Sequence, residues 1–290
     1  GFIYCQGRLG PGKFNELLLQ CKQLNKIVGS ETFNGSLFLL PKDCRLTEFT
    51  LEGISNIQGD FQCIDYFYVK EFVMPFIRVA GDMTIALNSG SVNTAAEIEF
   101  PKLQEIGGTL TLGTNRNANN ITFPLLKKIL GSCSVTTYKL KNDIEFTNLE
   151  SIGTDGADAQ IKFEIEATNI LCPKLKTING KFDIATSSFM FDMEVDKVSY
   201  PNVESISENL SITCPYSDFG SNGILSIDFS GLKSAKGISI SGQGDVTDFS
   251  SFKYLFENNV LTGESQWSVK ECGYNPTFQE MKDGKYKLAE

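Results

Sequence analysis

The sequence predicts a mainly β fold: a right-handed parallel β-helix, or β-solenoid, of coils about 25 residues long. Three observations support this prediction. First, the segment FPKLQEIGGTLTL, from Phe100 to Leu112, recurs in variants along the chain. Second, the starts of successive copies lie 20 to 29 residues apart, a period that is typical of solenoids. Third, both ends of the segment alternate apolar with polar residues, as half-buried strands do.

The other copies share a leading apolar residue, a turn, two apolar residues three positions apart and, in most copies, a final strand. They begin at Leu51, Met74, Phe123, Phe146, Cys172, Tyr200, Phe229 and Phe249. A single coil has too few inward apolar residues to close a core. Stacked coils supply the core together, because each strand becomes one rung of a long parallel sheet.

Each part of the unit has a structural role. The residues before the leading Phe alternate and predict a first strand. Pro101 then turns the chain, since it fixes φ and has no N–H. Leu103 and Ile106 return to the core across a tight side, for which a helical turn is one option. Gly107 and Gly108 supply the second corner, and the TLTL segment after them predicts a second strand.

We expect one repeat domain that spans residues 1–290. Residues 1–36 are expected to form an N-terminal cap, residues 37–255 the coils and residues 256–290 a C-terminal cap. Apolar residues at spacings of three and four predict an amphipathic helix over residues 11–28, which would cover the first coil.

Composition excludes several functions. The net charge is −9 and the chain has no dense Lys/Arg run, so nucleic acid is not an expected partner. No apolar run is long enough to span a bilayer. The chain has no His, which rules out Ser/His/Asp and Cys/His nucleophiles and makes a zinc site unfavourable. We expect neither a cofactor nor enzymatic activity.

The cysteines fall into two groups. Cys63, Cys133 and Cys172 stand where other copies have large apolar residues, which predicts buried thiols. Others lie towards the ends, where one or two disulfides would fasten the caps: Cys5, Cys21, Cys44 and Cys272.

The order of leading aromatic, Pro, Leu, Ile and Gly-Gly, followed by an alternating strand, resembles the receptor L-domain group of leucine-rich-repeat-like proteins. It looks closest to exported repeat proteins of gut bacteria, and the closing CGYNPTFQEMKDGKY is similar to the ends expected there. The resemblance implies binding or adhesion outside the cell, without a transferable set of functional residues. We therefore expect an exported protein that is extracellular or bound to the cell surface. An export signal is expected upstream of Gly1, and one alternative adds a lipid attachment point there.

The outward positions of the second strand form the first candidate surface. They are predicted to be Gln62, Thr84, Thr111, Ser134, Glu164, Asp183, Ser211 and Ser239. Small polar residues let a protein or glycan approach the backbone, although hydroxyl pairs between neighbouring strands would explain the same pattern. The candidate ligand-binding residues are Thr109, Thr111, Ser134, Asp183 and Ser211, together with Tyr66 and Tyr68 in the aromatic segment 66–76 and the loop residues 115–120.

The predicted function is a non-catalytic extracellular binding or adhesion module whose ligand is a host or cell-surface protein or glycan. One alternative is a carbohydrate-active enzyme, because Glu99, Glu145, Asp228 and Asp248 occupy outward positions of the first strand. Another alternative is a structural surface spacer.

Overall fold

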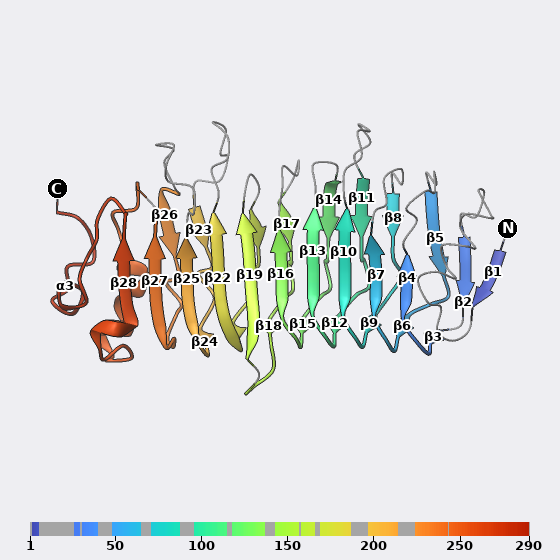
Figure 1. Ribbon diagram of the computed structural model, residues 1–290, viewed down its shortest axis with the longest axis horizontal. Helices are drawn as coiled ribbons and strands as arrows, with labels where there is room; N and C mark the ends of the chain where they lie inside the picture. Colours follow the sequence, from blue (N-terminus) through green and yellow to red (C-terminus); the bar gives the residue numbers. More distant parts are fainter. Residues whose placement is uncertain are drawn as a thin grey trace.

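The computed structural model describes residues 2–5, 26–29, 31–39, 48–64, 71–87, 96–114, 118–136, 143–156, 158–165, 169–186, 197–213, 224–242 and 244–289. These residues form a mostly parallel β-solenoid, as the repeat predicts (Figure 1). The coils stack along the long axis, with β1 at one end and α3 at the other.

Three long sheets run along the stack. The ten-stranded sheet is made of β4 (Leu37–Leu39), β7 (Phe61–Ile64), β10 (Met83–Leu87), β13 (Leu110–Thr114), β16 (Cys133–Thr136), β19 (Ala159–Ile165), β22 (Gly180–Thr186), β25 (Asn209–Thr213), β27 (Gly237–Ser241) and β28 (Trp267–Lys270). An eight-stranded sheet, called here the leading sheet, is made of β1 (Phe2–Cys5), β2 (Lys26–Gly29), β5 (Glu48–Glu52), β8 (Glu71–Val73), β11 (Ala96–Glu99), β14 (Ala118–Thr122), β17 (Ile144–Glu145) and β20 (Ile170–Leu171). A two-stranded sheet of β23 (Lys197–Ser199) and β26 (Ser226–Asp228) follows it.

The third long sheet, called here the corner sheet, lies where the sequence left a helical turn open. It is made of two-residue strands: β3 (Thr32–Phe33), β6 (Asn56–Ile57), β9 (Arg78–Val79), β12 (Glu105–Ile106), β15 (Lys128–Ile129), β18 (Ser151–Ile152), β21 (Thr177–Ile178) and β24 (Ser205–Ile206). In each strand the apolar residue is buried and its polar neighbour faces outward. A coil therefore carries three strands, one more than the sequence predicted.

The core holds one apolar residue per coil at each inward position. The leading aromatic residues stack along the axis: Phe100 and Phe123 have ring centroids 5.0 Å apart, and Phe123 and Phe146 have centroids 5.1 Å apart. All three rings are fully buried. Stacked coils thus build the core that one coil cannot close.

Side chains also join neighbouring coils at the corner before the ten-stranded sheet. Ser36 Oγ accepts the backbone N–H of Asp60 at 2.9 Å. Asp60 Oδ1 accepts the N–H of Asp82 at 2.9 Å, and Asp82 Oδ1 accepts the N–H of Thr109 at 2.7 Å. This ladder satisfies the backbone donors that immediately precede β7, β10 and β13.

The predicted N-terminal helix is wrong over its last residues. Residues 11–25 lie outside the described part of the chain, but Lys26–Gly29 form β2, which pairs in parallel with β1 and β5. Ile27 and Val28 form a short run of β-branched residues, and periodicity alone does not distinguish such a run from the end of a helix.

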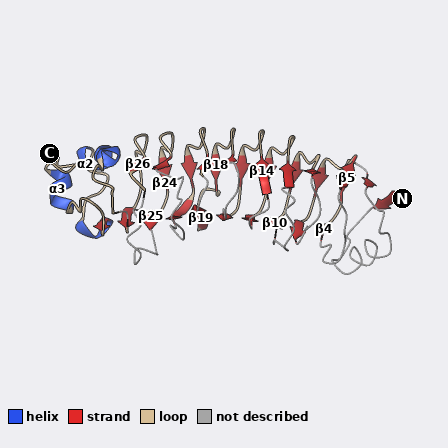
Figure 2. Ribbon diagram, turned by 90° about the horizontal axis from the view of Figure 1, so that it is seen from above, coloured by secondary structure: helices blue, strands red, loops and turns tan. Residues whose placement is uncertain are grey.

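The C-terminal end is covered by short helices and a returning tail, as Figure 2 shows. They comprise η2 (Ser250–Phe252), α2 (Lys253–Glu257), η3 (Glu264–Gln266) and α3 (Phe278–Lys282). The Trp267 indole N–H donates to the Pro276 carbonyl at 2.8 Å and ties β28 to this cap. In the described part of the chain, no helix is long and apolar enough to cross a membrane.

The three predicted core thiols are confirmed. Cys63, Cys133 and Cys172 are buried and not bridged, and burial raises the pKa of each, that of Cys133 to about 12. Cys272 is also a buried thiol, whose Sγ donates to the Lys270 carbonyl at 3.4 Å, so it does not form the expected cap disulfide. The side chain of Cys5 and the whole of Cys21 and Cys44 lie outside the described set.

Candidate functional site

The ten-stranded sheet brings most of the predicted site residues into one row. Thr111 pairs with Ser134, and Asp183 pairs with Ser211, each between adjacent strands. All four side chains are half-buried on the outward side, while the alternating residues fill the core. These residues therefore lie in one outward row of polar side chains, which Lys162 continues between Ser134 and Asp183.

One member of the predicted row is wrong. Ser134 pairs with Lys162, which in turn pairs with Asp183, so Lys162 and not Glu164 continues the row. Glu164 lies one outward position further along β19, opposite Thr136. Outward residues repeat every second position, and the extra residues before β19 shift the register by one such step.

The row is charged at its centre. Lys162 Nζ lies 2.5 Å from Glu164 Oε1, and Lys181 Nζ lies 3.0 Å from Asp183 Oδ2. The hydrogen bond from Lys162 lowers the pKa of Glu164, partial burial opposes that shift, and a hydrogen bond from Thr136 Oγ1 at 2.7 Å adds to it. Asp183, one of the candidate ligand-binding residues, therefore forms an ion pair with Lys181 of the same strand.

The remaining predicted residues lie elsewhere. Thr109 precedes β13 at the corner, where its N–H is held by Asp82. Tyr66 and Tyr68 lie outside the described residues, as do residues 115–117. Asn119 and Asn120 were expected in a loop but belong to β14, where Asn120 pairs with Glu97. The loop prediction failed there because β11 offers this segment a parallel partner, with a register shift between Ala96 and Glu97, and composition alone does not show that partner.

The leading sheet does not hold a continuous row of carboxylates. Glu99, Thr122, Glu145 and Leu171 occupy successive rungs. Glu99 and Glu145 therefore lie two rungs apart, roughly 9 to 10 Å along the stack. That spacing is near the upper limit for an inverting glycosidase pair and well above the spacing of a retaining pair.

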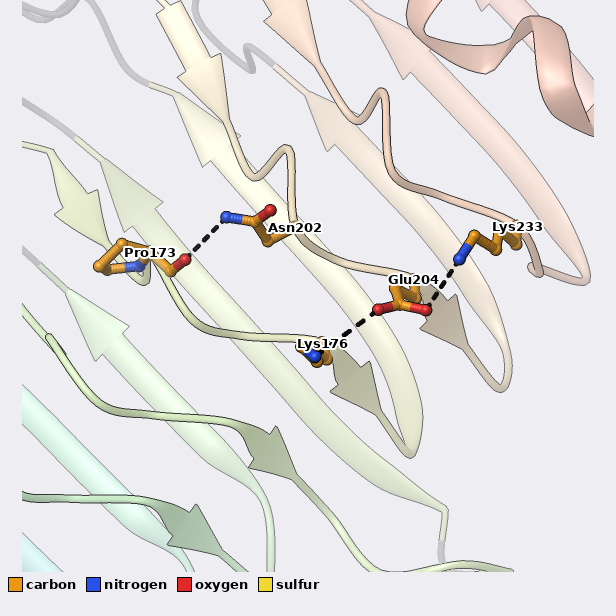
Figure 3. Close-up of polar contacts among 5 residues, drawn as sticks. All are labelled: Pro173, Lys176, Asn202, Glu204 and Lys233. Carbon is orange, nitrogen blue, oxygen red and sulfur yellow. Dashed lines mark hydrogen bonds and ion pairs between the residues drawn. The ribbon is translucent and has the colours of Figure 1, made fainter.

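A ladder of opposite charges lies immediately before the last strands of the corner sheet (Figure 3). Glu204 Oε2 lies 3.0 Å from Lys233 Nζ, and its Oε1 lies 3.9 Å from Lys176 Nζ. The hydrogen bond and the charge of Lys233 lower the pKa of Glu204. Beside this ladder, Asn202 Nδ2 donates to the Pro173 carbonyl of the preceding coil at 2.8 Å. These charges pair with one another across coils, which is a structural use for them.

A cleft that the sequence did not reveal lies near the C-terminal end. Its volume is about 420 Å³, and it is lined by Leu225, Ser226, Ile227, Asp228, Ser230, Thr247, Asp248, Ser250 and Ser251. Asp228 Oδ1 accepts the N–H of Ser230 at 3.0 Å, and Asp248 Oδ1 accepts the N–H of Ser250 at 2.7 Å. The repeat pattern placed both aspartates at outward positions, but it could not show that a cleft lies between them.

The described residues include no group of three or more Cys, Asp or Glu side chains placed to hold a metal ion. Comparisons with protein-family models, with curated proteins and with solved structures found no match.

Proposed function

We propose that this protein is a non-catalytic extracellular binding or adhesion module that recognises a protein or a glycan through the outward surface of its solenoid. The observation that carries the proposal is the in-register row of polar side chains on the ten-stranded sheet, from Gln62 to Ser268, in which Lys162 and Asp183 are charged and the other members are short and uncharged. Such a row gives an extended ligand a flat surface with repeated hydrogen-bonding groups close to the backbone.

Two features of the sequence support this function. The chain has no His, so the common hydrolase nucleophiles cannot be assembled. The repeat unit resembles that of receptor L-domains, a resemblance that implies binding or adhesion outside the cell. We propose on the same basis that the protein is exported and forms a single repeat domain. An export signal in the intact gene is the expected finding, and a gene without one would contradict export.

The binding function is tested on arrays of immobilised glycans and of matrix and cell-surface proteins. We expect the native chain to bind at least one arrayed ligand. The double variant Ser134→Arg/Ser211→Arg places bulky charges on the ten-stranded sheet and is expected to weaken that binding if the ligand lies on this face. The matched control is Ser151→Arg/Ser205→Arg, since both serines are half-buried, outward residues of the corner sheet.

A second function is favoured by one observation only. Glu99 and Glu145 face outward at a spacing near that of an inverting carboxylate pair. A polysaccharide-processing enzyme would release reducing sugar from a glycan panel, and Glu99→Gln or Glu145→Gln would abolish the release. Absence of both array binding and sugar release would favour a structural spacer.

A further inference from the structure

The leading side of the solenoid stops pairing at two places near its C-terminal end. The leading sheet ends at β20, and β23 and β26 form a separate two-stranded sheet (Figure 1). At the first break the Tyr200 hydroxyl donates to the Ile170 carbonyl at 2.9 Å, and the ring of Tyr200 is buried. A side chain of the protein thus satisfies the carbonyl of β20 at this break.

The second break lies between β26 and residues 246–249, and it is built differently. Among the described residues, no backbone hydrogen bond joins these two segments. Residues 247–249 pair instead with the C-terminal tail: Phe249 N–H donates to the Tyr286 carbonyl at 2.8 Å, and Leu288 N–H donates to the Thr247 carbonyl at 3.0 Å. The edge of β26 therefore borders the cleft rather than another rung.

An open strand edge presents backbone donors and acceptors to whatever enters beside it. The cleft volume of about 420 Å³ is within the usual range for binding pockets, about 300 to 1,000 Å³. Leu225, at the start of this edge, is 59% exposed and offers an apolar contact. Ser251 Oγ, on the opposite wall, is buried and has no hydrogen-bond partner among the described residues.

The charge of the cleft indicates the kind of ligand. Asp228 and Asp248 belong to successive coils and both line the cleft. Among the described residues, neither carboxylate forms an ion pair with a Lys or Arg side chain. Elsewhere on the solenoid Glu204, Glu208 and Asp183 each lie within ion-pair distance of a lysine. The net charge of −9 also favours the approach of a basic ligand.

We propose that the cleft binds an extended segment of a partner polypeptide, which pairs with the open edge of β26 and presents a Lys or Arg side chain to Asp228 and Asp248. This inference rests on the proposed binding function and names the site and the class of partner. A polypeptide fits better than a glycan because the strand edge offers backbone pairing, and none of the described residues lining the cleft is an aromatic ring on which a sugar would stack.

The test uses the full chain and a fluorescent, end-capped peptide of alternating Thr and Lys residues as the probe. We expect binding by fluorescence anisotropy that weakens about tenfold or more in Asp228→Asn/Asp248→Asn. The matched control is Asp155→Asn/Asp158→Asn, which removes the same charge from exposed residues between β18 and β19. A probe N-methylated at every second residue keeps its charge but cannot pair along one edge, and it is expected to lose binding by a similar factor.

Several results would overturn the inference. These are equal weakening in both Asn variants, full binding of the N-methylated probe, or no binding of the Thr-Lys probe at all. Binding of an oligosaccharide that is lost in Asp228→Asn/Asp248→Asn would also overturn it, in favour of a glycan site. An array ligand distinguishes failure of this inference from failure of the proposed function. If Ser134→Arg/Ser211→Arg weakens the binding of that ligand and Asp228→Asn/Asp248→Asn does not, the ligand does not bind in the cleft. The inference would then be refuted, while the proposed binding function would remain supported.

Discussion

The Asp82 carboxylate accepts the backbone N–H of Thr109 at 2.7 Å, and its Oδ1 fills the space where a side chain on Gly108 would begin. Gly81 stands in the same relation to Asp60. Gly81 and Gly108 are therefore required both by the aspartate side chain and by the backbone of the preceding coil. The hydrogen bond and the missing Cβ form one device that sets the close stacking of coils.

Gly108→Ala is expected to destabilise the fold by about 1 to 3 kcal/mol, because the new Cβ would overlap Asp82 Oδ1 and the backbone of Gly81. Gly113→Ala is the control, since nothing lies within 4 Å of a Cβ at that glycine of the same coil. Urea unfolding followed by circular dichroism measures both. Equal midpoints for the two variants would contradict the role of this corner.

Phe123→Ala is expected to lower the free energy of unfolding by about 3 to 5 kcal/mol. The Phe123 ring is fully buried and stacks between Phe100 and Phe146, so the change opens a cavity in the centre of the stack. Leu125→Ala, two residues away and 42% exposed, is expected to change stability by no more than about 0.5 kcal/mol. A loss at Phe123 no larger than that at Leu125 would contradict the stacked core.

The core thiols are expected to resist alkylation in the folded protein. Burial raises the pKa of Cys63, Cys133 and Cys172, so few thiolates exist at neutral pH and reagents cannot reach them. Iodoacetamide labelling followed by peptide mass spectrometry should mark these three residues only after denaturation. Rapid labelling of Cys133 in native protein would show that the ten-stranded sheet opens there.

Glu164 is expected to contribute stability that depends on pH. Its pKa is lowered from the ordinary value of 4.5, chiefly by the hydrogen bond from Lys162, so its contribution is present above about pH 4.5 and is lost as the pH falls through the lowered pKa. Glu164→Gln should therefore be less stable than the native chain at pH 7, and the difference should shrink on acidification. Chemical unfolding at a series of pH values measures the difference in free energy of unfolding between the two chains. A difference that grows at low pH would contradict a stabilising role of the ionised Glu164 carboxylate.

Much of the fold could be predicted from the repeat unit because the apolar residues within each unit keep the same spacing, although the length of the coil varies. Leu103, Ile106 and Leu110 are buried at the places that the alternation and the three-residue spacing assign to them. The corner sheet was not predicted, since a two-residue strand is too short to show a period and is defined by its neighbours in other coils. Residues 26–28 were assigned to a helix for the related reason that local spacing contains no information about an available sheet edge.

The candidate site was predictable only in part. The alternation placed Thr111, Ser134, Asp183 and Ser211 in one outward row, but register alone assigned Lys162 to it in place of Glu164. The cleft depends on a failure of pairing between β26 and the last coil. Such a failure leaves no mark on the spacing of apolar residues, because Phe229 and Phe249 remain buried on both sides of it.

Array binding of the native chain, measured beside reducing-sugar release from the same glycans, distinguishes a recognition module from an enzyme. We expect the native chain to bind at least one immobilised protein or glycan and to release no sugar. Sugar release that Glu99→Gln or Glu145→Gln abolishes, without any binding that the solenoid-surface variants weaken, would contradict a non-catalytic recognition module.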